Sequence, residues 1–281
     1  MTKRYKIIRK RRLTADITQL EIAAPLIAAK VKAGQFVILR VDADGERIPL
    51  TVSQKGEGTI IIVFQKVGLS TRRLDLLNVG DCLADLVGPL GDATHVEGYR
   101  NVAVVGGGLG SAIALPVAQA LFDKGAHVDL IAGFRSKSFV ILQEEMEEAC
   151  TQLHICTDDG SYGYNGFTTT RLESLIKEGR QYDCVFAIGP LIMMKLICQI
   201  TKAYEIPTIV SMNPIMVDGT GMCGGCRVTV GGEVRFACVD GPDFDGHQVD
   251  FDECIARNAT YKAQEAHACN LLAQAGEEVG R

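Results

Sequence analysis

The chain has 281 residues, of which 47% are hydrophobic and 22% charged, a composition that predicts folded domains with more than one hydrophobic core. Its formal net charge of -5 and the absence of a basic patch interleaved with aromatic residues argue against a nucleic-acid partner. Because no run of about eighteen uncharged apolar residues occurs, no membrane span is predicted.

Residues 1–98 contain six short runs of alternating or β-branched residues, which predict strands at Lys6–Ile8, Ile17–Ile22, Phe36–Val41, Leu50–Val52, Thr59–Gln65 and Cys82–Val87. Six strands separated by glycine-rich turns are typical of an antiparallel β-barrel or sandwich. Basic residues from Lys3 to Arg12 alternate with apolar ones, so we expect a charged edge strand and not a targeting signal. One short helix is expected after Gly68, from about Ser70 to Leu77.

The pattern changes over residues 99–212, where fully apolar runs alternate with helical segments. Strands are expected at Val102–Val105, Val128–Ala132, Leu153–Cys156, Cys184–Ile188 and Thr208–Val210, with helices at roughly 111–124, 142–151, 168–178 and 191–204. Apolar strands joined by helices form a parallel sheet that is covered on both faces, so this segment is predicted to be an α/β domain.

A glycine-rich turn joins the first of these strands to its helix and consists of Gly106, Gly107, Gly108, Leu109 and Gly110. The free N–H groups and the dipole at such a helix start attract a pyrophosphate. The turn is therefore predicted to bind a nucleotide, and a tight packing turn is the alternative.

Residues at the ends of three other strands are further candidates for the nucleotide site. No acidic residue closes the second strand, which runs into Arg135, so the residues alone do not decide between NAD and NADP. Asp159 follows the third strand, and Gly189 with Pro190 follows the fourth, at the carboxyl edge where ligands bind in such sheets. Ordinary strand-to-helix turns are the alternative reading of these positions.

Three closely spaced cysteines, Cys223, Cys226 and Cys238, follow Asp218 in a module of residues 213–251. A two-iron cluster needs four anionic ligands, and the glycines between these residues allow the chain to wrap closely, so a [2Fe-2S] site is predicted. Two valine-rich runs on either side of Gly231-Gly232 predict a hairpin that brings the last cysteine back to the cluster.

Other interpretations of the thiols remain open. A zinc knuckle would need a fourth Cys or His ligand, and the only histidine nearby is His247. Redox-inert thiols are a further alternative. Asp218 could also merely cap the loop and leave Cys254 or another group to complete the site. Five other cysteines lie in apolar or helical patterns typical of reduced, buried thiols in a cytoplasmic protein: Cys82, Cys150, Cys156, Cys184 and Cys198. Residues 252–281 are expected to form one amphipathic helix that docks a partner or covers the chain's own core.

The order of a barrel and then a nucleotide-binding sheet resembles the ferredoxin-NADP reductase superfamily of flavoproteins. Arg47-Ile48-Pro49-Leu50-Thr51 resembles its flavin-binding strand, which implies that Arg47 contacts the FAD pyrophosphate and that backbone groups of Leu50, Thr51 and Val52 face the isoalloxazine. The run that contains Gly68, Ser70 and Thr71 resembles the family's second phosphate element. Gly88 opens a Gly-Pro-Leu-Gly run that is similar to the linker beside the flavin.

Within that superfamily, a two-iron module at the C-terminus is typical of the dihydroorotate dehydrogenase electron-transfer subunit and its relatives. The dihydroorotate subunit uses four cysteines. The spacing Asp-x4-Cys-x2-Cys-x11-Cys that begins at Asp218 resembles instead the small subunit of NADH-dependent ferredoxin:NADP oxidoreductase, also known as a sulfide dehydrogenase subunit. The resemblance implies FAD, NAD(H) and a [2Fe-2S] cluster in this chain, with a larger partner subunit that carries its own flavin and four-iron clusters.

The function implied by this resemblance is electron transfer between NADH, FAD and the cluster, in a complex that couples NADH, NADPH and, indirectly, ferredoxin by flavin-based electron bifurcation. The electron-transfer subunit of an NAD-dependent dihydroorotate dehydrogenase is one alternative. A non-catalytic iron-sulfur relay subunit is another. No residue is predicted to act as a general acid or base, because hydride transfer requires alignment more than proton transfer.

Overall fold

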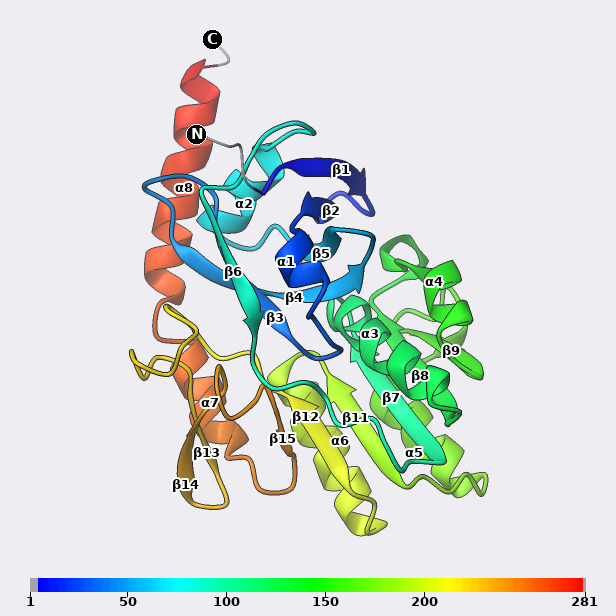
Figure 1. The fold of residues 1–281 in the computed structure, drawn as a ribbon. Helices are drawn as coiled ribbons and strands as arrows, with labels where there is room; N and C mark the ends of the chain where they lie inside the picture. The colour runs from blue at the N-terminus through cyan, green and yellow to red at the C-terminus, as the bar shows by residue number, and fades with distance from the viewer. Residues whose placement is uncertain (1–4, 280–281) are drawn as a thin grey trace.

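The computed structural model describes residues 5–279, with side chains to Leu271, so Lys3, Arg4 and the last two residues lie outside the described part (Figure 1). The N-terminal part forms a six-stranded antiparallel sheet in the order β1-β2-β5-β4-β3-β6. Its strands are β1 (Ile7–Arg12), β2 (Ile17–Ala23), β3 (Phe36–Arg40), β4 (Arg47–Lys55), β5 (Thr59–Gln65) and β6 (Asp85–Leu90). All six predicted strands are present, and the basic β1 lies at an edge as expected.

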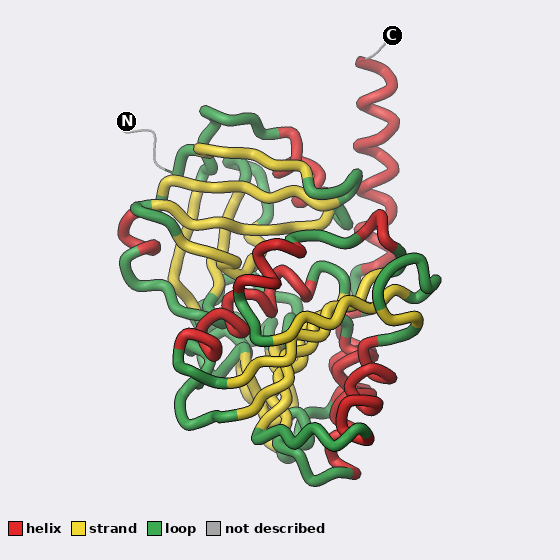
Figure 2. The backbone as a smooth tube through the Cα atoms, turned by 90° about the vertical axis from the view of Figure 1, so that its right-hand side faces the viewer, coloured by secondary structure: helices red, strands yellow, loops and turns green. Residues whose placement is uncertain are grey.

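The N-terminal sheet curls around its own hydrophobic core (Figure 2). Alternation along β2 places Leu20 and Ile22 inside, where they meet Ile60, Ile62 and Phe64 of β5, all fully buried. One isolated bridge between residues 6 and 82 joins the two edges of the sheet. The strands therefore curve into an open barrel: in the described part of the chain, no continuous ladder of hydrogen bonds joins the edge strands β1 and β6.

A buried carboxylate fastens helix α2 (Leu69–Leu76) to this sheet. Asp75 accepts a hydrogen bond from Thr18 at 2.6 Å and lies 3.1 Å from Arg12, 3.5 Å from Lys66 and 3.9 Å from Lys10. Burial disfavours its charged form, but the Thr18 hydroxyl and the three cations outweigh that effect and hold the pKa of Asp75 below its usual value. A further short helix, α1 (Pro25–Ala28), was not predicted.

The second part is a seven-stranded sheet in the order β10-β9-β8-β7-β11-β12-β15, parallel except for β15. Its strands are β7 (Asn101–Gly107), β8 (His127–Phe134), β9 (Gln152–Thr157), β10 (Tyr164–Asn165), β11 (Cys184–Ile188), β12 (Thr208–Ser211) and β15 (Asp243–Asp245). The connecting segments are α3 (Gly110–Asp123), the 3-10 turn η1 (Lys137–Phe139), α4 (Gln143–Glu148), α5 (Thr168–Lys177) and α6 (Leu191–Ala203). The five predicted strands and four predicted helices are confirmed.

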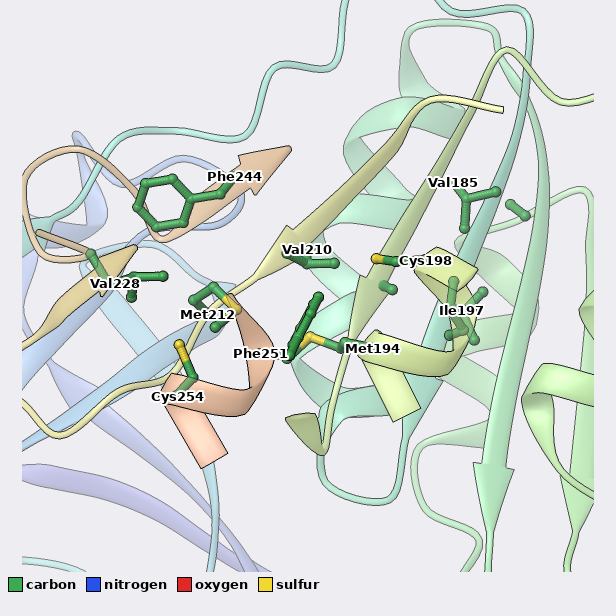
Figure 3. Packing of buried hydrophobic residues seen from close by; sticks show 14 of the residues in the cluster. Val185, Met194, Ile197, Cys198, Val210, Met212, Val228, Phe244, Phe251 and Cys254 are labelled. Atoms are coloured by element: carbon green, nitrogen blue, oxygen red, sulfur yellow. The ribbon is translucent and has the colours of Figure 1, made fainter. Parts of the chain in front are cut away.

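Helices cover both faces of the parallel sheet because its strands are apolar on both sides. Along β7, Val102 and Val104 belong to the core that contains α3, whereas Ala103 and Val105 belong to the core that contains α5 and α6. The second core continues into the C-terminal module, where Phe251 lies beside Met194 of α6 (Figure 3).

The segment between β12 and β15 leaves the sheet and returns to the same edge. It contains the predicted hairpin, β13 (Arg227–Val230) and β14 (Glu233–Phe236), whose turn residues Gly231 and Gly232 have φ values of 60° and 83°. Positive φ at both positions fits a two-residue hairpin turn with the twist of its strands. Strand β15 was not predicted, and it pairs Asp243 with Ser211 of β12.

The single helix expected from residue 252 onward is wrong, because the structure has two helices, α7 (Phe251–Asn258) and α8 (Lys262–Val279). Between them the N–H of Thr260 donates to Arg257 O at 3.1 Å, a tighter turn than that of an α-helix. Asn258 and Thr260 favour such a break because their polar side chains compete with the helix backbone.

The break between α7 and α8 sends the two helices to different surroundings. Helix α7 packs Phe251 and Cys254 into the core of the sheet and the C-terminal module, whereas α8 runs beside the N-terminal sheet near α2 (Figure 1). Most side chains of α8 that are described are exposed. None of the helices in the described range is both long and apolar enough to cross a membrane.

Candidate functional site

A cavity of about 750 Å³ lies between the N-terminal sheet and the carboxyl edge of the parallel sheet. Ten of the predicted cofactor residues line it: Pro49, Leu50, Thr51, Gly107, Gly108, Leu109, Gly110, Arg135, Gly189 and Pro190. These residues come from segments far apart in the sequence, so the fold brings the predicted flavin and nucleotide elements to one space. Its size suits ligands of the nucleotide class.

The glycine-rich turn is shaped by close backbone contacts. A Cβ atom at Gly110 would lie 2.3 Å from Ile188 O, and one at Gly107 would lie 2.5 Å from Met193 Sδ. Gly108 has a φ of 57°, and its N–H donates to Gly133 O at 2.8 Å. The N–H groups of Leu109 and Gly110 have no partner within the turn, so they can bind an anion at the start of α3.

Two further observations agree with an anionic ligand at this end of the cavity. The hydroxyl of Ser111, fully buried in the first turn of α3, has no hydrogen-bond partner among the described residues. Arg135, after β8, lines the cavity with a cation that attracts an anion; the other charged lining residue is Asp158, after β9. The residues present therefore fit a phosphate-bearing nucleotide.

Asp159 lies beside this cavity but does not line it. Hydrogen bonds from the hydroxyl of Ser161 at 2.6 Å and from its N–H at 2.9 Å fix the carboxylate. These bonds favour the ionised form and lower the pKa of Asp159. The carboxylate of Asp159, fixed by Ser161, is therefore a negatively charged hydrogen-bond acceptor near Arg135 at the end of β9.

Seven other predicted cofactor residues do not line the cavity: Arg47, Val52, Gly68, Ser70, Thr71, Gly88 and Gly106. At the start of α2, the Thr71 hydroxyl accepts the N–H groups of Val67 and Gly68, each at 3.0 Å, and Ser70 donates to Glu46 at 2.9 Å. This turn still has the unpaired first N–H groups of a helix. Gly88 is packed instead, since its Cβ would lie 2.7 Å from Val37.

The cavity wall also contains apolar residues that the sequence did not reveal. Phe36, Met193, Met212 and Met216 line it. Met212 follows β12, so the same carboxyl-edge rule that selected Gly189 would have found it. Phe36 had no such signal, because it enters the wall only through the packing of the two sheets.

The predicted cluster ligands form two pairs. The Sγ atoms of Cys226 and Cys238 are 3.2 Å apart and buried. Asp218 accepts the N–H of Thr220 at 2.8 Å and that of Cys223 at 3.1 Å, and these backbone bonds lower its pKa. One pair is buried, and the other contains the exposed Cys223.

This donor set fits a two-iron cluster better than a single ion. No three His, Cys, Asp or Glu side chains converge on one ion position in the described residues. In a two-iron cluster each iron takes only two protein ligands, in agreement with the two pairs. Gly219, Gly221 and Gly224 have positive φ and bring the backbone around the site, where the N–H of Gly225 lies 3.4 Å from Cys223 Sγ.

Cys254 is buried in the same hydrophobic core as Cys226 and Cys238 and lies near Met212 (Figure 3). Burial raises the pKa of its thiol to about 11, and it also raises that of the predicted ligand Cys238, so the thiol pKa does not distinguish the two. His247 lies near Thr201, with Nε2 at 3.0 Å from the hydroxyl. Cys254 therefore stays an alternative to Asp218 as the fourth ligand.

Comparison with known proteins agrees with this arrangement. The family model for the iron-sulfur cluster binding domain of dihydroorotate dehydrogenase B matches residues 213–250. The chain is 44% identical over 262 residues to the dihydroorotate dehydrogenase B (NAD(+)) electron transfer subunit homolog of Thermotoga maritima, with 92% of each chain covered. The chain belongs to the family of dihydroorotate dehydrogenase B electron transfer subunits and their homologues.

Two further proteins are closely similar to the present chain. The chain is 47% identical over 275 residues to a protein of Clostridium beijerinckii described as an uncharacterized protein in the adh 3' region, and the match covers 94% of this chain and 93% of that protein. A solved structure of NADH-dependent reduced ferredoxin-NADP oxidoreductase matches 97% of this chain and 99% of that chain, with 40% identity and a TM-score of 0.92.

These matches confirm the family resemblance and the fold class. The chain is an oxidoreductase-family electron transfer subunit whose cofactors are FAD, NAD(H) and an iron-sulfur cluster. The zinc interpretation of the cysteines is set aside, because the matched domain of residues 213–250 is an iron-sulfur cluster binding domain.

Proposed function

We propose that this chain passes electrons between NADH, FAD and a [2Fe-2S] cluster, as one subunit of a complex that couples NADH, NADPH and ferredoxin by flavin-based electron bifurcation. Asp218 carries the proposal: its carboxylate accepts the backbone N–H of Cys223 at 3.1 Å, and its spacing to the three cysteines supports it as the fourth ligand. The similarity to the ferredoxin-NADP oxidoreductase structure along nearly the whole chain supports it.

Residues 1–98 hold FAD in this proposal, residues 99–212 hold the nicotinamide nucleotide, and residues 213–251 hold the cluster. Bound FAD supplies the change from a hydride to single electrons. Pro49, Leu50 and Thr51 place the flavin against the wall of the cavity, and Arg47 with the N–H groups at the start of α2 holds its pyrophosphate. This arrangement supports FAD at the junction of the two sheets.

The nicotinamide nucleotide occupies the other end of the cavity. The N–H groups of Leu109 and Gly110 bind its pyrophosphate, and Gly189 with Pro190 leaves room for the nicotinamide. Asp159 accepts ribose hydroxyls, which favours NADH over NADPH because a carboxylate repels a 2'-phosphate. The chain's residues thus bind and align the two cofactors and supply no acid or base to the hydride itself.

The cluster binds through Asp218 and Cys223 on one iron and Cys226 and Cys238 on the other. An oxygen ligand changes the electron density at its iron, so Asp218 tunes the reduction potential. The partner in this proposal is a larger subunit with its own flavin and four-iron clusters.

The electron-transfer subunit of an NAD-dependent dihydroorotate dehydrogenase is the second candidate, and the match of residues 213–250 to that enzyme's cluster domain favours it. Asp218 separates the two candidates, because the dihydroorotate subunit uses four cysteines. A relay subunit without a nicotinamide reaction is disfavoured by the open N–H groups of the glycine turn.

Anaerobic purification of the native protein with its partners tests the proposal. We expect a larger flavoprotein with four-iron clusters to co-purify and NADH to bleach the flavin of this chain. Recovery of a dihydroorotate dehydrogenase instead would move the chain to pyrimidine metabolism, and absence of bleaching by NADH would leave only the relay function. In the Asp218→Cys variant the cluster should persist with a changed spectrum, whereas an unchanged spectrum would show that Asp218 is not a ligand.

A further inference from the structure

A carboxyl group lies beside a buried hydroxyl where three segments of the chain meet. Asp243 begins β15 and pairs with Ser211 at the end of β12. Thr94, on the connection between the two sheets, is 7% exposed, and its hydroxyl lies 2.5 Å from Asp243 Oδ2. The same connection is fixed to the barrel, since the N–H of Thr94 donates to Ala33 O at 2.9 Å. Asp243 is therefore held in a built polar site.

The carboxyl of Asp243 has no cation to compensate its charge. Among the described residues it forms no ion pair. By its exposed surface, Asp243 is half-buried. Desolvation of its carboxyl raises its pKa, and hydrogen bonding by Thr94 and Ser211 opposes that rise only in part. The titratable residues on the adjoining segments are Lys32, Asp92, His95 and Asp245, and none of them contributes to the shift.

This polar site adjoins the cavity at the end that lacks charged residues. Ser211 and Pro242, the neighbours of Asp243, line the cavity. The charged lining residues, Arg135 and Asp158, follow β8 and β9, whereas Ser211 belongs to β12 on the other side of β7 and β11. Three strand spacings separate β8 from β12, or about 14 Å. Asp243 is thus placed to respond to charge at the end of the cavity away from Arg135.

A charge change in the cavity follows from the chemistry of the nicotinamide. A hydride carries two electrons and one proton, so its transfer from NADH into the cavity adds one negative charge there, and the nucleotide leaves as NAD+. A nearby negative charge disfavours the ionised form of a carboxyl group and raises its pKa. If the carboxyl group is ionised beforehand, the rise in its pKa makes it take one proton from solvent.

We propose that Asp243 is the charge-compensating group of the cavity, binding one solvent proton when a hydride enters and releasing it when the two electrons leave. The inference rests on the proposed function, because it requires a redox cofactor in the cavity. Ser211 couples the two places, since it pairs with Asp243 across β12 and β15 and also lines the cavity. The consequence is a reduction potential that depends on pH through Asp243.

Spectroelectrochemical titration of the flavin against pH tests this inference in the purified holoprotein. Over the pH range where Asp243 titrates, the midpoint potential of the wild type should fall by about 30 mV per pH unit more than that of Asp243→Asn, since one proton per two electrons corresponds to about 30 mV per tenfold change. Asp245→Asn is the matched control: it lies two residues along β15, exposed and bonded to Gln248, and should keep the wild-type slope.

A second variant keeps the carboxyl group. Thr94→Val removes a hydrogen bond that favours the ionised form, so the pKa of Asp243 should rise further and the steep region should move to higher pH. Infrared titration of the apoprotein gives a readout that needs no cofactor: the wild-type carbonyl band should contain a titrating component that is missing in Asp243→Asn.

Equal slopes in the wild type and Asp243→Asn would overturn the inference while leaving the proposed function intact. If the flavin is not reduced by NADH, the proposed function itself fails. The infrared band then still reports whether Asp243 titrates in the apoprotein.

Discussion

Gly110, at the start of α3, lies directly against the backbone at the end of β11, so replacing it should be costly. A methyl group at Gly110 would lie 2.3 Å from Ile188 O and 2.8 Å from the Cα of Gly189. Backbone atoms at the end of β11 cannot rotate away, and the whole helix start must move. Overpacking of this kind costs about 1–3 kcal/mol, and we expect Gly110→Ala to lie at about 3 kcal/mol.

Gly108→Ala is the matched control two residues earlier. Its Cβ would meet open space, and only the positive φ of 57° opposes it, at a cost of about 1 kcal/mol. Denaturant unfolding of both apoproteins, followed by circular dichroism, compares the midpoints at equal slope. The difference of about 2 kcal/mol should appear as a clearly lower midpoint for Gly110→Ala. Equal midpoints for the two variants would refute the contact argument.

Three further predictions concern other parts of the chain. Asp75→Asn should lower the free energy of unfolding by about 2 kcal/mol at pH 7. Because folding lowers the pKa of Asp75, the carboxylate stabilises the fold above its usual pKa of about 3.9, and this stabilisation is lost as the pH falls through the folded pKa. The melting temperatures of the wild type and the variant should therefore converge below about pH 4. Cys226→Ala should lose the cluster iron on elemental analysis, whereas Cys254→Ala should retain it, and loss of iron in both would make Cys254 a ligand. Asp159→Ala should lower the affinity for NADH about tenfold in a binding titration and that for NADPH less. Equal losses of affinity for the two nucleotides would show that Asp159 does not bind the ribose.

The secondary structure was largely predictable because its signals are local. Strand β7 is apolar on both sides and ends in glycines, which specifies both its burial and the turn that follows. The pair Gly231-Gly232 specified the hairpin by its positive φ. Strand β15 has only three residues, two of them aspartates, and becomes a strand only because β12 offers an edge.

The candidate site was predictable where function requires a particular backbone or a charged ligand. Such requirements marked the glycine turn, Asp218 and the three cysteines. The apolar wall had no comparable signal, since Phe36 and Met216 resemble any core residue until the two sheets pack. The hydrogen bond between Thr94 and Asp243 joins residues 149 positions apart, a pairing that no local pattern reveals.

Strands β12 and β15 are adjacent and antiparallel, so the cluster-bearing segment between them has the topology of a long hairpin loop whose two ends lie side by side. A segment with adjoining ends can be exchanged without rerouting the rest of the chain. In topology, a short turn in place of the module would still join β12 to β15. A different redox module with closely spaced termini could be grafted between the same two strands.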